Sequence, residues 1–291
     1  MELIQVGEKT YYIKNATNLG IYKINDNNVY LIDSGNDKDA GKKILKIIES
    51  NNWKVKGIIN THSNADHIGG NKIIQDRTNC DIYSKGIEKT FTEFPILESS
   101  FLYGGYPFKN LKNKFLLAKS SNVIQIQDNL PEGLEYFSLK GHFFDMIGIK
   151  TSDNIYFLAD SLFSRETITK YHLFFIYDIK EYLKTLDFLS TLNGNLYIPS
   201  HCEATHDISS LIEINKNKIE EISNKIYNVC ENEKTFEEIL KYIFDEYNLN
   251  MNENQYVLVG STIKSYLSYL NDENKLNYKF NNNKMLWKKI T

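Results

Sequence analysis

Arginine is almost absent from this chain of 291 residues: of its 34 basic residues, only Arg77 and Arg165 are arginines, and the others are lysines. Acidic residues outnumber basic ones, so the formal net charge is −3. Nucleic-acid-binding proteins usually carry a surplus of basic residues, and arginine is the side chain that best grips phosphate and guanine. The composition therefore argues against a nucleic-acid partner.

The sequence also lacks long apolar runs and a regular set of cysteines. No stretch of about 18 apolar residues occurs, so we expect no segment that spans a membrane. The N-terminal residues have neither the basic start nor the apolar stretch of a secretion signal. Cys80, Cys202 and Cys230 are far apart and odd in number, which argues against a disulfide framework. We therefore expect a cytoplasmic protein.

Strand and helix patterns are abundant. Apolar or alternating stretches predict strands at 3–6, 11–14, 19–24, 29–32, 55–60 and 81–83, and again at 123–126, 134–139, 147–150, 155–159 and 195–199. Helical spacing of apolar residues predicts helices at 39–49 and 178–192. Because the strands come in pairs rather than as a continuous βαβ repeat, we expect two sheets with helices outside them.

The C-terminal part is predicted to be a separate small module. Helical periodicity covers 208–229 and 255–270, Thr235 and Glu238 form a capping-box pattern, and 276–287 reads as a hairpin. This order predicts a winged-helix-like module, so we divide the chain into residues 1–207 and 208–291. Residues 231–291 contain 8 lysines, no arginine and 9 acidic residues. That composition is unfavourable for binding phosphate groups, and it favours a role of this module in packing or dimerisation.

An unusually aromatic segment lies between residues 91 and 115. Seven of these 25 residues are aromatic, and Pro95, Pro107 and the pair Gly104 and Gly105 lie among them. A rigid, irregular segment of this kind is typical of a pocket wall or lid. A buried loop or a dimer contact is an equally good interpretation. As a lid, it would place Tyr103 and Tyr106 over the functional site.

The strongest chemical signal is the decapeptide Thr61-His62-Ser63-Asn64-Ala65-Asp66-His67-Ile68-Gly69-Gly70. It follows a predicted buried strand and supplies three candidate metal ligands within six residues. Imidazole and carboxylate are common zinc ligands. A short loop can offer several of them only if it curls around the ion.

This decapeptide resembles the H-x-H-x-D-H signature of the metallo-β-lactamase superfamily. Later elements follow in the family's order, each past the end of a predicted strand: Gly141-His142, Asp160 and His201. The resemblance covers about residues 1–207. It implies an α+β protein built as an αββα sandwich, with metals at one edge of the two sheets.

The resemblance also implies two metal positions. The first would use His62 and His142, the second Asp66, His67 and His201, and Asp160 would bridge both. Asn64 stands where the family usually has a histidine, and an amide is a much poorer zinc ligand than imidazole. We therefore expect one tightly bound zinc at the second position and a weak or empty first one. Iron or manganese would also suit these ligands.

The implied activity is hydrolysis with water activated by the metal, in which Asp66 orients the nucleophile and carries its proton. The decapeptide also looks like that of the glyoxalase II branch, which favours a small-molecule thioester or related ester. Arg165 is a candidate clamp for a substrate carboxylate or a surface residue, and Asp145 is a candidate to orient a ligand from behind. The alternatives are a non-hydrolytic metal-binding sensor or scaffold, and an RNA phosphodiesterase with a C-terminal winged helix.

Overall fold

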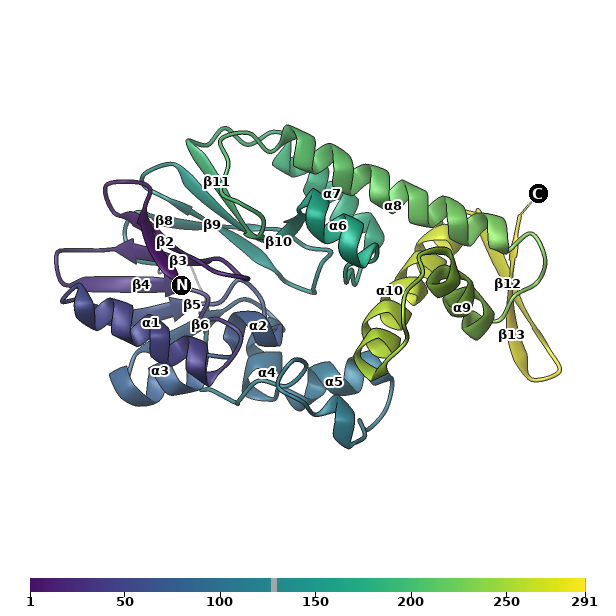
Figure 1. The fold of residues 1–291 in the computed structure, drawn as a ribbon, viewed down its shortest axis with the longest axis horizontal. Coiled ribbons are helices and arrows are strands. Elements are labelled where there is room, and N and C mark those ends of the chain that lie inside the picture. The colour runs from purple at the N-terminus through teal and green to yellow at the C-terminus, as the bar shows by residue number, and fades with distance from the viewer. Residues whose placement is uncertain (127–129, 291) are drawn as a thin grey trace.

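The computed structural model describes residues 1–126 and 130–290. Within these residues, two β-sheets face each other with helices on their outer surfaces, and further helices and a hairpin extend from one end (Figure 1). The predicted α+β class and αββα sandwich are confirmed. No helix in the described part of the chain is both long and apolar enough to cross a membrane.

The first sheet contains seven strands in sequence order, antiparallel from β1 to β4 and parallel from β4 to β7. They are β1 (Glu2–Gln5), β2 (Thr10–Lys14), β3 (Leu19–Lys23), β4 (Asn28–Ile32), β5 (Lys54–Ile59), β6 (Asp81–Ser84) and β7 (Ile124–Gln125). The second sheet has the order β11-β10-β9-β8. Its strands are β8 (Leu134–Ser138), β9 (Ile147–Thr151), β10 (Ile155–Phe163) and β11 (Leu196–His201).

Helices cover both outer faces. On the first sheet lie α1 (Lys38–Ser50) and α3 (Asn71–Thr78), and on the second lie α7 (Ile179–Leu189) and α8 (Ser209–Val229) (Figure 1). Short helices occupy the loops near one sheet edge. They are α2 (Ala65–Ile68), α4 (Glu88–Glu93), α5 (Ile96–Tyr103), the 3₁₀ turn η1 (Lys109–Leu111) and α6 (Arg165–Tyr171).

The alternation within strands explains the layers. In β4, Val29 and Leu31 pack in the cluster beneath α1, together with Ile44. Ile32 points to the opposite face and joins the cluster between the two sheets, where it meets Phe157 of β10. Successive strand residues face opposite sides of a sheet, so both faces of this strand are buried.

The strand β10 is longer than the predicted 155–159. It continues to Phe163, and its pairing with β11 shifts register between Phe157 and Ala159 and again between Ala159 and Phe163. Ala159 has a φ of 48°, in the left-handed region that residues with a side chain rarely adopt. Such irregularities re-aim side chains. Here they redirect Asp160, the next residue.

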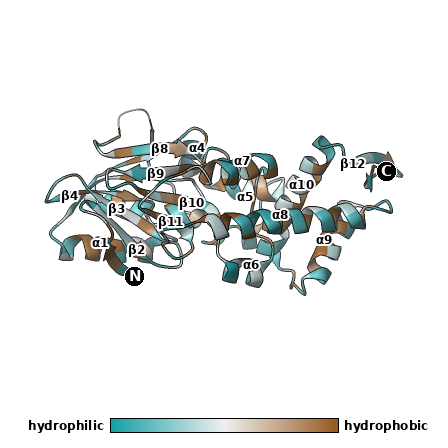
Figure 2. Cartoon of the chain, turned by 90° about the horizontal axis from the view of Figure 1, so that it is seen from above, coloured by the Kyte–Doolittle hydropathy of each residue, from teal (hydrophilic) through white to brown (hydrophobic). Residues whose placement is uncertain are grey.

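The C-terminal elements are α8, α9 (Phe236–Glu246), α10 (Glu253–Asp272), β12 (Leu276–Asn281) and β13 (Lys284–Lys289). The predicted helices, hairpin and Thr235–Glu238 capping box are all present. Seen from above, α8 leads from the sandwich to the C-terminal helices, with teal and brown residues alternating along it (Figure 2). One apolar cluster joins β10, α7, α8, α9 and α10. The division at residue 207 and the winged-helix likeness remain predictions.

Candidate metal centre

The decapeptide forms the turn between β5 and α2. Thr61 donates both its backbone N–H and its hydroxyl to Asp33, at 2.8 and 2.7 Å, which anchors the turn to the end of β4. Gly69 and Gly70 close α2 against the segment 34–37. A side chain at Gly69 would collide with the backbone of Asn36, and one at Gly70 with the carbonyl of Ser34. This close approach explains the glycine pair.

The six predicted ligands lie together in two groups that share one carboxylate. One group contains Asp66, His67, Asp160 and His201, and the other contains His62, His142 and Asp160. Within each group the ligand atoms all lie within 4.8 Å of one another. In the first group, the Nε2 atoms of His67 and His201 each lie 3.0 Å from an oxygen of Asp160. Segments far apart in sequence thus meet at one sheet edge.

Each histidine is held from behind through its Nδ1 atom. His67 pairs with Asp33 at 2.8 Å, His142 with the carbonyl of Phe175 at 2.8 Å and His201 with the carbonyl of Ala16 at 3.1 Å. The Nδ1 atom of His62 lies 3.1 Å from the Thr61 hydroxyl. A carbonyl or carboxylate behind Nδ1 keeps a proton there, so in the neutral state of such a ring the lone pair is on Nε2 and faces the cluster.

Nε2 of His62 is buried without a hydrogen-bond partner within the described residues. Nε2 of His67 and Oδ1 of Asp160 are also buried; they lie 3.0 Å from each other and have no further partner there. Leaving a buried polar atom unpaired costs about 1–3 kcal/mol. A divalent cation would satisfy such atoms, because neutral imidazole and carboxylate are its usual protein ligands. The residues present therefore fit a metal ion.

The electrostatics of the two groups differ. Burial lowers the pKa of both His62 and His142, so these imidazoles are neutral at pH 7. Burial also opposes protonation of His67 and His201, but the nearby carboxylates, Asp160 above all, outweigh it. They hold the pKa of His67 well above its usual value and raise the pKa of His201 to about 10. A cation bound at this group would therefore replace two protons.

Asn64, at the substituted ligand position, lies between His142 and a buried carboxyl group. Its Oδ1 is 3.0 Å from Nε2 of His142, and its Nδ2 donates to Oε1 of Glu98 at 2.6 Å. Burial raises the pKa of Glu98 well above its usual value. Sequence reasoning missed Glu98. Its only signal is an acidic residue within the apolar sequence of α5.

A cavity of about 650 Å³ opens above the cluster, within the size range of small-molecule sites. Asn64, Asp66, His142, Asp160 and His201 form part of its wall.

Tyr103 and Tyr106 do not line this cavity, so their placement over the site was wrong. Arg165 is also outside its lining, which favours the surface alternative over the clamp. On α5, Glu98 and Leu102 are four residues apart and share the buried face, whereas Tyr103 lies about 100° further round and is exposed. Tyr106 is 78% exposed. Arg165 is an exposed first residue of α6. From the aromatic segment, Phe115 reaches the cavity.

A sequence profile of the metallo-beta-lactamase superfamily matches residues 14–201, which is more than half of the chain. The chain belongs to the metallo-beta-lactamase superfamily. A search of curated proteins found no match.

Solved structures of the superfamily resemble this chain in fold. A beta-lactamase domain protein from Burkholderia ambifaria covers 99% of this chain and 94% of its own, with a TM-score of 0.74 and 12% identity. A metallo-beta-lactamase family protein from Thermus thermophilus covers 99% and 98%, with a TM-score of 0.72 and 14% identity. DIM-1 metallo-beta-lactamase covers 76% and 97%, with a TM-score of 0.54 and 16% identity. The first two therefore extend over the C-terminal elements as well.

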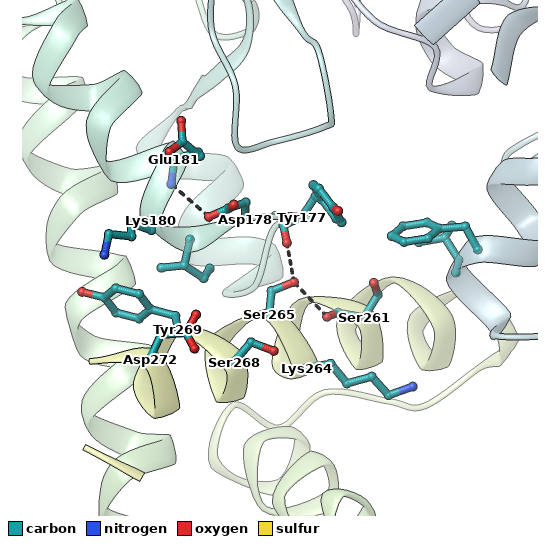
Figure 3. A pocket seen from close by; sticks show the side chains of 13 residues that line it. Tyr177, Asp178, Lys180, Glu181, Ser261, Lys264, Ser265, Ser268, Tyr269 and Asp272 are labelled. Carbon is teal, nitrogen blue, oxygen red and sulfur yellow. Dashed lines mark hydrogen bonds between the residues drawn. The ribbon is translucent and has the colours of Figure 1, made fainter. Parts of the chain in front are cut away.

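In this metallo-beta-lactamase fold, the C-terminal helix α10 is part of the candidate site. Gln255, Leu258, Val259 and Thr262 line the cavity. The Thr262 hydroxyl accepts a hydrogen bond from the N–H of Ile176 at 3.3 Å, next to the Phe175 carbonyl that holds His142. One turn further on, Ser265 donates to the carbonyl of Tyr177 at 2.7 Å (Figure 3). The sequence had indicated only packing or dimerisation for this module.

Asp145 makes no hydrogen bond or ion pair with any of the candidate ligands, so its predicted role behind them was wrong. Its carboxylate pairs with Lys140 at 2.9 Å and accepts from the N–H of Ile87 at 3.2 Å. The buried Glu88 does connect the two ligand loops. Its carboxylate accepts from the N–H and hydroxyl of Ser63, beside His62, and from the N–H of Asp145 in the His142 loop. Burial raises the pKa of Glu88 to about 7.

Proposed function

We propose that this protein is a metal-dependent hydrolase that cleaves an ester, thioester or related bond of a small molecule with water. The observation that carries the proposal is the convergence of six ligand-type side chains at the wall of a small-molecule-sized cavity, with Nε2 of His62 buried and unpaired among the described residues. Membership of a superfamily of metallo-hydrolases supports it.

Asp66, His67, Asp160 and His201 are the residues that would hold the tighter ion, with zinc as the best match to this donor set. A bound divalent cation supplies Lewis-acid chemistry, because it acidifies water and polarises a carbonyl oxygen. The His62 and His142 side is the weaker position. There Oδ1 of Asn64 lies 3.0 Å from Nε2 of His142, in the space that a cation bound to this nitrogen would need.

Asp66 is the carboxylate best placed to move a proton. Its side chain is 32% exposed and lines the cavity, whereas that of Asp160 is 5% exposed. The Thr17 hydroxyl donates to Oδ2 of Asp66 at 3.0 Å and fixes its orientation. In this proposal Asp66 accepts a proton from the attacking water and returns it to the leaving group, as a general base and then a general acid.

The thioester preference rests on the likeness of the decapeptide to the glyoxalase II branch. The alternative of an RNA phosphodiesterase finds less support in the cavity. Apart from histidines, its described lining has one cationic side chain, Lys170, against the carboxylates of Glu166 and of the cluster. Phosphodiester binding usually draws on several lysines or arginines.

A substrate panel tests the proposal. Zinc-loaded protein is assayed with p-nitrophenyl acetate, an S-acyl thioester and bis-p-nitrophenyl phosphate, alongside the isosteric variant Asp66→Asn and the surface control Asp187→Asn. We expect turnover of the ester or thioester, and a loss of about 10²–10⁴-fold in Asp66→Asn, the usual contribution of a general acid–base. The control should match the native protein. Absence of turnover, or full activity in Asp66→Asn, would refute the proposal.

A further inference from the structure

The cavity has an apolar half that faces the candidate metal ligands. Its walls come from three distant parts of the chain: Leu116 after the aromatic segment, Phe163 and Phe174 at the end of β10 and beyond α6, and Leu258 and Val259 on α10. We infer that the substrate is an uncharged ester or thioester with an extended apolar acyl chain, and that α10 determines the accepted chain length. This inference rests on the proposed hydrolase function.

The apolar surface begins directly beside the ligand cluster. The Phe163 ring lies parallel to the imidazole of His201, with centroids 6.0 Å apart, and stacks on Phe174 at 4.2 Å. Leu116, Phe163, Phe174 and Val259 are all buried. An acyl chain whose carbonyl carbon lay at the cluster would therefore run along hydrocarbon from its first methylenes.

The charges around the cavity oppose an anionic acyl group. Lys170 is exposed, and its ammonium lies 4.7 Å from the centre of the Tyr171 ring. Glu166 and the buried carboxyl group of Glu98 also border the cavity, and Arg165 is outside its lining. A carboxylate on the acyl chain would meet apolar surface and acidic groups, which is costly without a paired cation.

The α10 wall is fixed in position. Thr262 and Ser265 hydrogen-bond to the 176–177 segment, at 3.3 and 2.7 Å. On its other side, Leu258 packs with Leu116 in a cluster that also contains Leu102 of α5. A wall braced from two sides leaves a defined space, so a larger side chain at this wall shortens the chain that fits.

Chain-length preference and two enlarged variants test the inference. The zinc-loaded protein is assayed with p-nitrophenyl acetate, octanoate and the mono-p-nitrophenyl ester of suberic acid, which carries a terminal carboxylate. Each buried methylene contributes about fourfold to binding. Since some chain atoms stay solvated, we expect kcat/KM to be at least about 100-fold higher for octanoate than for acetate, and the suberate ester to lose most of this gain.

In Val259→Phe and Leu258→Trp the octanoate-to-acetate ratio should fall at least tenfold. Ser268→Phe, on the exposed side of the same helix, is the matched control and should keep the native ratio. Leu258 is only partly buried, so its variant keeps the test valid if Val259→Phe misfolds. Equal turnover of acetate and octanoate, or an unchanged ratio in a folded Leu258→Trp, would overturn the inference but not the hydrolase function. Absence of turnover of every ester and of the S-acyl thioester would overturn the hydrolase function itself.

Discussion

Replacing Asp33 by asparagine should weaken metal binding although Asp33 is not itself a candidate metal ligand. The Asp33 carboxylate is buried and accepts three hydrogen bonds, from the N–H and hydroxyl of Thr61 and from Nδ1 of His67. An amide has only one acceptor oxygen. In either orientation, its NH₂ group would face the N–H of Thr61 or the Nδ1 proton of His67. In the second case His67 must move its proton to Nε2, where it blocks coordination.

The expected size follows from these contacts. Loss of a partner behind a metal-bound histidine typically costs 10–100-fold in metal affinity, or about 1.4–2.7 kcal/mol. Because the hydrogen bonds to a charged carboxylate are lost, the metal-free protein should also lose about 1.5–3 kcal/mol of unfolding free energy. Backbone strain should not contribute to this loss of stability, because Asp33 has a φ of 63°, a conformation that asparagine also tolerates.

The assay is a zinc titration in competition with a fluorescent chelator, together with urea unfolding in EDTA. Asp37→Asn is the matched control. Asp37 caps α1 by accepting from the N–H groups of Asp39 and Ala40, and asparagine caps equally well. It should therefore leave zinc affinity unchanged. If Asp33→Asn binds zinc within twofold of the native protein, the idea that Asp33 fixes the His67 tautomer is wrong.

Three further outcomes are expected. In EDTA, raising the pH from 5 to 8 should cost the native protein about 2–3 kcal/mol more stability than Glu88→Gln. Glu88 binds its proton more tightly in the folded protein than in the unfolded chain, so its contribution to stability falls as the pH rises toward about 7. Parallel curves of stability against pH for the native protein and the variant would exclude this effect. Asn64→His should bind about one more zinc per chain; no gain would mean that the His62 and His142 side is not a metal position. Calorimetry in two buffers at pH 7 should show release of about two protons per zinc, from His67 and His201, and release of none would contradict their raised pKa values.

Strand patterns placed several candidate ligands near predicted strand ends, and the superfamily resemblance implied that they come together at one edge. His62 follows β5 and His201 ends β11, two strands whose apolar runs are visible in the sequence. Asp160, expected past the end of its strand, lies within β10. The predicted extent of β10 was too short, because its register shifts depend on pairing with β11 rather than on its own residues. The metal-binding roles of these residues remain predictions.

The supporting residues could not be predicted in the same way. Asp33, Glu88 and Glu98 act through contacts between residues 25 to 57 positions apart, and no local spacing in the sequence indicates such contacts. The predicted placement of Tyr103 over the site was wrong for a different reason. The aromatic content of the segment was visible, but the face of α5 that turns inward is fixed by packing. The contribution of α10 likewise depends on how a C-terminal helix folds back onto α5 and α7.

The most direct test of the account is hydrolysis measured while zinc is returned to EDTA-treated protein. The account predicts that the metal-free protein is inactive, and that ester or thioester turnover rises in proportion to added zinc and saturates near one ion per chain. The position filled first should be the group of Asp66, His67, Asp160 and His201. Turnover that persists without metal, or its absence when this group is fully occupied, would contradict the account.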